Sequence, residues 1–266
     1  MSRALKHLFI ALILVLLAAP LVVVFGVSLN GARSLQFPPQ QLSLHWYGAM
    51  FAQKEWLVPL RNSLLIATTA SALATLVALP LALHVWTRKG LAARLITTLG
   101  VAPFMLPPVI TALGFLVFWI SLGLYGRIFA TIISHAVFLE TLPLVTISLG
   151  LKAMDRALIE AARTMGATRW GVMHSVILPL IAPYIASGYA FAFVLSLNEY
   201  IIAYMVSGFT VETLPIKIFN SLRYGYTPIM AVVSVVFVLT AVLVFGLIGR
   251  FGNLPRLLGA DRVEGR

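Results

Sequence analysis

Two acidic residues, Glu140 and Glu199, lie inside long apolar stretches of the sequence, and Asn198 directly precedes the second. In an apolar environment an ionisable side chain is strongly unfavourable unless it faces a polar cavity or a partner, so each carboxylate is a candidate for binding a solute. The alternative is a structural pair, with His135 or with a residue of another subunit. His135 and Glu140 are five residues apart, about 140° around a helix, so these two do not share a face. We therefore favour a solute-path role for Asn198 and Glu199 and leave both interpretations open for Glu140.

The residue patterns that would support catalysis or a bound cofactor are missing from the sequence. There is no cysteine, which excludes disulfides, thiolate metal sites and cysteine nucleophiles. The arrangements H-E-x-x-H and G-x-S-x-G are absent, as is the GxxxxGK[ST] loop that cradles nucleotide phosphates. The sequence also offers no convincing acid–base pair. It therefore predicts a protein that is not an enzyme, holds no metal and binds no cofactor of its own.

Three prolines, Pro103, Pro107 and Pro108, open one of the apolar stretches. Proline has no N–H to donate, so a regular helix cannot continue through all of them. Irregular backbone at membrane depth is tolerated only where protein or a water-filled path surrounds it. Pro107 and Pro108 therefore belong either to a kinked packing helix or to the wall of a translocation path, and the sequence favours neither.

The composition places these residues in a membrane. Hydrophobic residues make up 61% and charged residues 10% of the 266 residues, whereas a typical soluble domain carries about 25% charged residues. Six apolar stretches provide the roughly 20 helical residues that a bilayer crossing needs. The expected spans are Leu8–Leu29, Asn62–Trp86, Leu95–Leu122, Ile128–Leu151, Leu180–Val206 and Pro228–Ile248. The sequence thus predicts an all-α, polytopic membrane protein with six transmembrane helices.

The distribution of the basic residues indicates how these spans are oriented. With the N-terminus in the cytoplasm, six of the 19 Lys and Arg residues fall in external segments and the other thirteen in internal ones. This bias follows the positive-inside rule, so we expect both termini in the cytoplasm. The basic residues stand singly or in pairs, which argues against nucleic acid as the reason for the net charge of +11. Arg3 and Lys6 would also suit a signal peptide, but the apolar run behind them is too long, so we expect a retained span.

The internal segment between the fourth and fifth spans, residues 152–179, has the pattern of a short amphipathic helix. Asp155 is a suitable N-cap, and Gly166 can take the left-handed conformation that ends a helix. Glu160 and Arg163 are placed to pair on one face. The apolar residues at helical spacing on another face are Leu158, Ala161, Ala162 and Met165. Such a helix can lie on the membrane, pack on its own bundle or insert into a groove on a partner, and the residues alone favour the first two.

The same segment resembles the EAA motif of the type I ABC importer permeases, which reads E-A-A-x3-G-x9-I-x-L-P. Here it consists of Glu160-Ala161-Ala162, three residues, Gly166, nine residues and Val176-Ile177-Leu178-Pro179. It departs once, with Val176 at the isoleucine position, which is a conservative apolar change. Asn62-Ser63-Leu64, which opens the second span, is also similar to the family. The resemblance covers most of the chain, from about residue 62 to residue 248.

The resemblance implies that this chain forms part of the membrane path, while partner proteins bind ATP and deliver the solute. The loop Asp155–Gly166 would be the coupling helix that docks on a cytoplasmic ABC ATPase dimer, and ATP and Mg²⁺ would bind to that dimer. The docking residues implied are Leu158, Glu160, Ala161, Ala162, Arg163, Met165 and Gly166. A second permease subunit, in a heterodimer, would complete the path in the bacterial inner membrane, and an external solute-binding protein would deliver the solute. The chain would comprise an N-terminal helix with an external loop (1–61), a five-helix permease core (62–250) and a cytoplasmic tail (251–266).

The solute that the resemblance implies is a polyamine. Residues 196–200 and 213–217 are similar to the corresponding parts of the spermidine/putrescine-type permeases. Two acidic residues and no Lys or Arg within the expected spans also suit a cationic solute. Phosphonate, ferric iron and thiamine are alternatives for the same role. An ion-driven secondary transporter fits less well, because it would predict inverted repeats and several buried ionisable residues.

Overall fold

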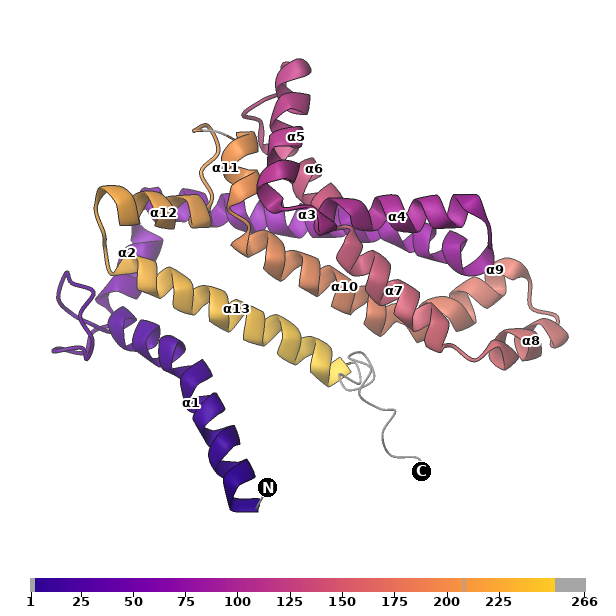
Figure 1. The fold of residues 1–266 in the computed structure, drawn as a ribbon, viewed down its shortest axis with the longest axis horizontal. Helices are drawn as coiled ribbons and strands as arrows, with labels where there is room; N and C mark the ends of the chain where they lie inside the picture. The colour runs from indigo at the N-terminus through magenta and orange to yellow at the C-terminus, as the bar shows by residue number, and fades with distance from the viewer. Residues whose placement is uncertain (1–2, 208, 252–266) are drawn as a thin grey trace. The chain divides into compact units, whose positions relative to one another are not determined.

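The computed structural model describes residues 3–207 and 209–251, and within them all regular structure is helical (Figure 1). A single isolated bridge, between Asn30 and Leu42, is the one pairing of strand type among the described residues. The elements in chain order are α1 (Arg3–Ser28), α2 (His45–Ala52), α3 (Lys54–Thr87), α4 (Leu91–Met105), α5 (Pro108–Ser121), α6 (Ile128–Leu139), α7 (Thr141–Ala153), α8 (Arg156–Thr164), α9 (Arg169–Val172), the π-helix η1 (Met173–Ile177), α10 (Leu178–Asn198), α11 (Ile201–Ser207), α12 (Leu214–Tyr224) and α13 (Ile229–Phe251).

The long helices have the length and the surface of membrane spans. Within the described residues, five helices are long and apolar enough to cross a bilayer, and α4 with α5 makes a sixth if the bent pair counts as one span. The five are Ala4–Ser28, Lys54–Thr87, Ile128–Ala153, Arg169–Asn198 and Ile229–Leu247. Of these, Ile128–Ala153 comprises α6 and α7, and Arg169–Asn198 comprises α9, η1 and α10. Large apolar side chains remain exposed along them, and Leu16 of α1 is 70% exposed. Such a surface is stable in lipid. The prediction of an all-α polytopic membrane protein is confirmed.

The third predicted span, Leu95–Leu122, is not one straight helix. α4 ends at Met105, α5 begins at Pro108, and the two helices are bent by 104° with respect to each other. Pro107 has an extended backbone (ψ 132°), and Pro108 occupies the first turn of α5, where its missing N–H leaves no hydrogen bond unmade. The break therefore falls at the proline pair as predicted, although Pro103 is accommodated within α4.

The fifth predicted span, Leu180–Val206, is also interrupted, and here the prediction of a continuous helix was wrong. α10 ends at Asn198, Glu199 has an extended backbone (ψ 123°), and α11 begins at Ile201. Neither proline nor glycine marks this break in the sequence. The side chain of Glu199 stabilises it instead, by accepting hydrogen bonds from the first turn of α11.

Helices α7 and α10 pack closely within one compact unit, which comprises Asn62–Thr213 and Val242–Arg266. Two glycines allow this approach. A Cβ atom on Gly188 would lie 2.5 Å from Pro143 Cα, and one on Gly150 would lie 2.6 Å from the ring of Tyr184. Small residues at helix contacts are the usual means by which helices approach one another in lipid. The buried side chains around this contact are Leu144, Ile147, Leu151, Ile177 and Ile181.

The other compact unit comprises Met1–Arg61 and Leu214–Ala241. Its core forms around Trp56, which is 1% exposed. Side chains of α2, the start of α3, α12 and the start of α13 surround this ring, among them Met50, Leu214, Ile229, Val232 and Val233. The three-part division expected from the sequence stays a prediction, and its tail, residues 251–266, lies outside the described residues except for Phe251.

Candidate functional site

Helix α8 begins and ends as its sequence predicts. The Asp155 carboxylate accepts a hydrogen bond from Ala157 N at 2.9 Å, so Asp155 is the N-cap. At the other end Gly166 has φ +85°, Gly166 N donates to Arg163 O at 2.9 Å, and Ala167 N donates to Ala162 O at 3.0 Å. These two bonds and the left-handed glycine form a Schellman C-cap. Both ends of α8 are therefore fixed by local interactions.

The apolar residues of α8 do not all serve one surface. Ala162 is 8% exposed and packs with partly buried Ile159 against the core that contains Leu151 and Val172. In contrast, Leu158 is 48% exposed and Met165 is 82% exposed. Ala161 is also exposed. One side of α8 thus fastens the helix to its own bundle, while the other side leaves apolar side chains uncovered.

The expected ion pair on α8 is not formed. Glu160 and Arg163 are both exposed, and the structure records no hydrogen bond or ion pair between their side chains among the described residues. Both charged groups are therefore available to a partner.

The second half of the predicted motif anchors the segment to the bundle. Thr168 caps α9 by accepting a hydrogen bond from Gly171 N at 3.1 Å. The π-helix η1 then leads into α10, with Ile177 buried and Pro179 in the first turn of α10. Trp170 was not among the residues predicted from the sequence, and it is 73% exposed. Its ring contacts the His174 ring edge to face, with the ring centroids 4.1 Å apart. A lone aromatic residue in a polar internal segment was the feature that would have identified it.

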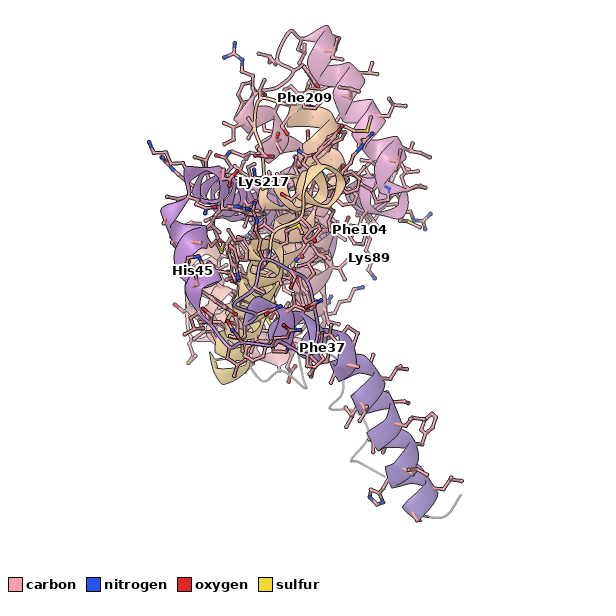
Figure 2. All side chains as sticks on the ribbon, turned by 90° about the vertical axis from the view of Figure 1, so that its left-hand side faces the viewer. Phe37, His45, Lys89, Phe104, Phe209 and Lys217 are labelled. Carbon is pink, nitrogen blue, oxygen red and sulfur yellow. The ribbon has the colours of Figure 1, made fainter. Side chains whose placement is uncertain are left out.

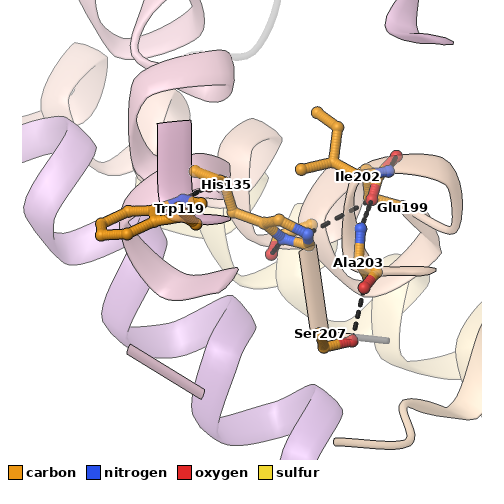
Figure 3. A network of polar contacts seen from close by, with 8 residues as sticks. Trp119, His135, Glu199, Ile202, Ala203 and Ser207 are labelled. Carbon is orange, nitrogen blue, oxygen red and sulfur yellow. Dashed lines mark hydrogen bonds and ion pairs between the residues drawn. The ribbon is translucent and has the colours of Figure 1, made fainter. Parts of the chain in front are cut away.

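A polar network surrounds the break between α10 and α11 (Figure 3). His135 Nε2 of α6 lies 3.2 Å from Glu199 Oε2, and the two side chains are 1% and 9% exposed. Glu199 also accepts hydrogen bonds from Ile202 N and Ala203 N, each at 2.9 Å. The other ring nitrogen of the histidine, Nδ1, lies 2.8 Å from Ser196 Oγ. Within the described part of the chain, the Glu199 carboxylate therefore contacts His135 and two backbone N–H groups of α11.

The other predicted path residues lie at separate places. Asn198 is exposed, and its Nδ2 donates to Val194 O at 2.8 Å. Glu140 lies at the junction of α6 and α7, and its Oε1 is buried without a hydrogen-bond partner in the described part of the chain. A Cβ atom on Gly100 of α4 would lie 3.8 Å from this oxygen. Pro107 and Pro108 are exposed at the bend between α4 and α5. No hydrogen bond or ion pair of the described residues joins Glu140 to Asn198 or Glu199.

The charged side chains do not gather into a metal-binding group. Among residues 3–207 and 209–251, no three His, Asp or Glu side chains are placed to hold an ion together. The polar contacts around Glu199 join α6 to the start of α11, and Leu158 and Met165 of α8 are exposed.

Comparison with known proteins places this arrangement in a family. Residues 73–253 match the family described as binding-protein-dependent transport system inner membrane component. The putrescine transport system permease protein PotI of Escherichia coli (strain K12) is 35% identical over 196 residues, which cover 70% of this chain and 69% of that protein. The spermidine/putrescine transport system permease protein PotC of the same strain is 25% identical over 265 residues, 99% of this chain and 97% of that protein.

Solved structures share the fold. A chain of a bacterial ABC transporter involved in the import of the acidic polysaccharide alginate superposes with a TM-score of 0.70 at 15% identity, covering 94% of this chain and 98% of the other. A chain of the MetNI methionine ABC transporter in an inward-facing conformation gives a TM-score of 0.60 at 19% identity, covering 78% and 97%. The family match and the apolar helices make this a multi-pass inner-membrane protein, and a transport subunit, not an enzyme. The chain belongs to the binding-protein-dependent transport system inner membrane components, as a permease subunit of a type I ABC importer.

Proposed function

We propose that this subunit forms part of a polyamine translocation path and that α8 is the element on which the ATPase acts. The main support for ATPase action on α8 is that this helix has two different surfaces. Ala162 is buried against the subunit's own core, whereas Leu158 and Met165 are 48% and 82% exposed. A helix anchored on one side and apolar on the other suits insertion into a groove of a partner protein.

The docking surface proposed for the ATPase comprises Leu158, Glu160, Ala161, Arg163 and Met165, with Gly166 setting the direction of the chain behind them. Ala162 belongs to the anchoring side of the helix. ATP and Mg²⁺ bind to the ATPase dimer, because this chain lacks the phosphate-binding loop. Movement of α8 is transmitted to the bundle through the packed residues around Ile177 and Leu151, which is rigid-body coupling of packed helices.

Support for a polyamine as the solute comes from the relatives and from the charges. The relatives described above are named as spermidine/putrescine and putrescine permeases. The Lys and Arg residues of the described spans lie toward the helix ends, at Lys6, Lys54, Arg61, Lys152 and Arg169, whereas the acidic Glu140 lies in the middle of the span Ile128–Ala153. Glu140 Oε1 has no partner in the described part of the chain, so this carboxylate is the proposed cation contact in the path. Asn198, Pro107 and Pro108 are proposed as further path residues, while Glu199 is kept as a candidate whose carboxylate is engaged by His135.

One subunit with six spans encloses little of a solute path, so the proposed importer needs further subunits. A second, related permease subunit completes the path in a heterodimer, and an external solute-binding protein delivers the polyamine. Both termini lie in the cytoplasm, in agreement with the excess of Lys and Arg in the internal segments. This orientation places α8 on the side of the ATPase and the loop between α1 and α3 outside.

Uptake of labelled putrescine and spermidine into cells that express the whole importer tests this proposal. The expected result is uptake that depends on the permease, on the ATPase and on the binding protein. Uptake that persists without the ATPase would overturn the coupling role of α8. Import of a different solute, such as thiamine, without any polyamine uptake would overturn the substrate and leave the permease role intact.

A further inference from the structure

A cavity of about 500 Å³ lies in the compact unit formed by Met1–Arg61 and Leu214–Ala241. This volume is in the range of small-molecule sites. Aromatic rings form much of its wall, namely Trp46, Trp56, Tyr224 and Tyr226. Three charged side chains, Arg33, Glu55 and Lys217, also line it. The cavity is therefore chemically suited to a ligand that has both charge and apolar surface.

One alkylammonium group already occupies part of this cavity, and the chain itself supplies it. Lys217 of α12, labelled in Figure 2, has its Nζ atom 3.3 Å from Glu55 Oε2. The same Nζ lies 5.4 Å from the centroid of the Trp56 ring. A carboxylate beside an aromatic face is the arrangement that binds an organic ammonium ion, through ionic and cation–π attraction. Lys217 thus shows where an ammonium group fits.

The simpler interpretation is an ion pair that only fastens α12 to the start of α3. Two observations weaken it. The Glu55 side chain is 60% exposed and that of Lys217 is 18% exposed, and an ion pair with one exposed partner is largely screened by solvent. Trp56, in contrast, is packed in the core with 1% exposure and also lines the cavity. A fixed aromatic face beside a cavity is more than a fastening pair requires.

We propose that Glu55 and Trp56 form a site for a terminal ammonium group of the polyamine, and that Lys217 occupies this site until the solute displaces it. The site rests on the proposed polyamine substrate and on the proposed orientation, which places the cavity outside the membrane. Beside the Glu55 carboxylate the solute's ammonium group takes the place of the Lys217 ammonium, which turns toward solvent on its flexible side chain. The methylene groups of a polyamine have apolar surface to contact on the aromatic wall.

Direct binding of radiolabelled putrescine and spermidine to the purified importer complex, without its binding protein, tests this site. If Lys217 is a competing occupant, Lys217→Ala tightens binding, by about threefold to tenfold, whereas Glu55→Gln weakens it by about tenfold. The opposite signs are the distinguishing result. A pair that only fastens two helices would give weaker or unchanged binding in both variants, and that outcome overturns the proposal. Lys217→Gln, which retains most of the side chain, should behave as Lys217→Ala.

Arg61→Ala is the matched control. Arg61 is an exposed basic residue of α3 in the same compact unit, and it does not line the cavity. Its removal should leave the affinity unchanged, and a gain equal to that of Lys217→Ala would assign the effect to net charge and overturn the proposal. Polyamine uptake by the wild-type importer is measured alongside. Uptake without the opposed effects on binding refutes this site alone, whereas absence of uptake refutes the proposed function.

Discussion

Glu199 Oε2 lies 3.2 Å from His135 Nε2, although 64 positions separate the two residues in the chain. This contact joins α6 to the break between α10 and α11. The same carboxylate receives two backbone N–H groups of α11, so it stabilises a helix start within an apolar part of the bundle. A residue that resembles a solute ligand in the sequence is thus placed to hold the fold together.

Glu199→Ala is expected to destabilise the protein. It leaves the N–H groups of Ile202 and Ala203 without their acceptor and removes the partner of His135, and an unsatisfied buried donor costs about 1–3 kcal/mol. Thermal unfolding of the purified importer in detergent measures the loss. Asn198→Ala is the control, because Asn198 is exposed and bonds only to Val194 O, so stability should hold there. If Glu199→Ala left the unfolding temperature unchanged and altered only the preference among polyamines, Glu199 would instead be a solute ligand.

Met165→Asp is expected to uncouple the importer without disturbing its fold. The side chain is 82% exposed, so a charge there costs the isolated subunit little, but it would place an unpaired charge in an apolar interface with the ATPase. Retention of the ATPase during purification should fall at least about tenfold, as a loss of roughly 1.4 kcal/mol predicts. Lys89→Ala, at an exposed position in another predicted cytoplasmic loop, should retain the ATPase. Normal retention by Met165→Asp would remove α8 from the interface.

Gly166→Asp is expected to abolish uptake while the protein still inserts into the membrane, and Glu160→Lys is expected to do the same by reversing a charge on the exposed surface. At Gly166 the reason is the backbone, since φ is +85° and no atom lies within 4 Å of the missing Cβ. A side chain in this conformation costs about 1–2 kcal/mol. Asparagine and aspartate both tolerate it better than most residues, but aspartate adds a negative charge at the C-terminal end of α8, so Gly166→Asn should retain more uptake. Equal loss in both variants, at equal membrane levels, would show that a side chain is excluded there for another reason.

Gly188→Ala is expected to weaken the contact between α7 and α10. The added Cβ would lie 2.5 Å from Pro143 Cα, and backbone atoms cannot move aside as a flexible side chain can. Overpacking of this kind costs about 1–3 kcal/mol, which thermal unfolding detects. Gly114→Ala is the matched control, because Gly114 is also helical but has nothing within 4 Å of its missing Cβ. A normal unfolding temperature for Gly188→Ala would mean that α7 and α10 do not need a glycine at their contact.

Local features of the chain were predictable from its sequence. Asp155 and Gly166 mark the ends of α8 because capping depends on a few neighbouring residues, and the structure places both ends as expected. The Pro107 and Pro108 pair marks the break between α4 and α5 for the same reason. Proline interrupts the hydrogen bonds of a helix, but it does not determine the angle at which the next helix continues. The bend of 104° therefore had no sequence signal.

Features that depend on distant residues were not predictable. The apolar residues on both sides of Glu199 predicted one continuous helix. The interruption depends on the hydrogen bonds that Glu199 accepts from α11 and on its contact with His135, and the tertiary fold brings these groups together. The spacing of Leu158, Ala161, Ala162 and Met165 indicated one apolar face, but only packing against Leu151 and Val172 decides that Ala162 is buried and Met165 is not. Periodicity identifies apolar positions and does not distinguish an internal partner from an external one.

ATP hydrolysis by the reconstituted importer, with and without binding protein loaded with putrescine or spermidine, tests whether α8 couples polyamine import to the ATPase. Either loaded binding protein is expected to stimulate hydrolysis several-fold in the wild type, and Met165→Asp is expected to remove the stimulation while the permease remains folded in the membrane. Hydrolysis that does not respond to polyamine-loaded binding protein, or that responds equally in Met165→Asp, would contradict this coupling.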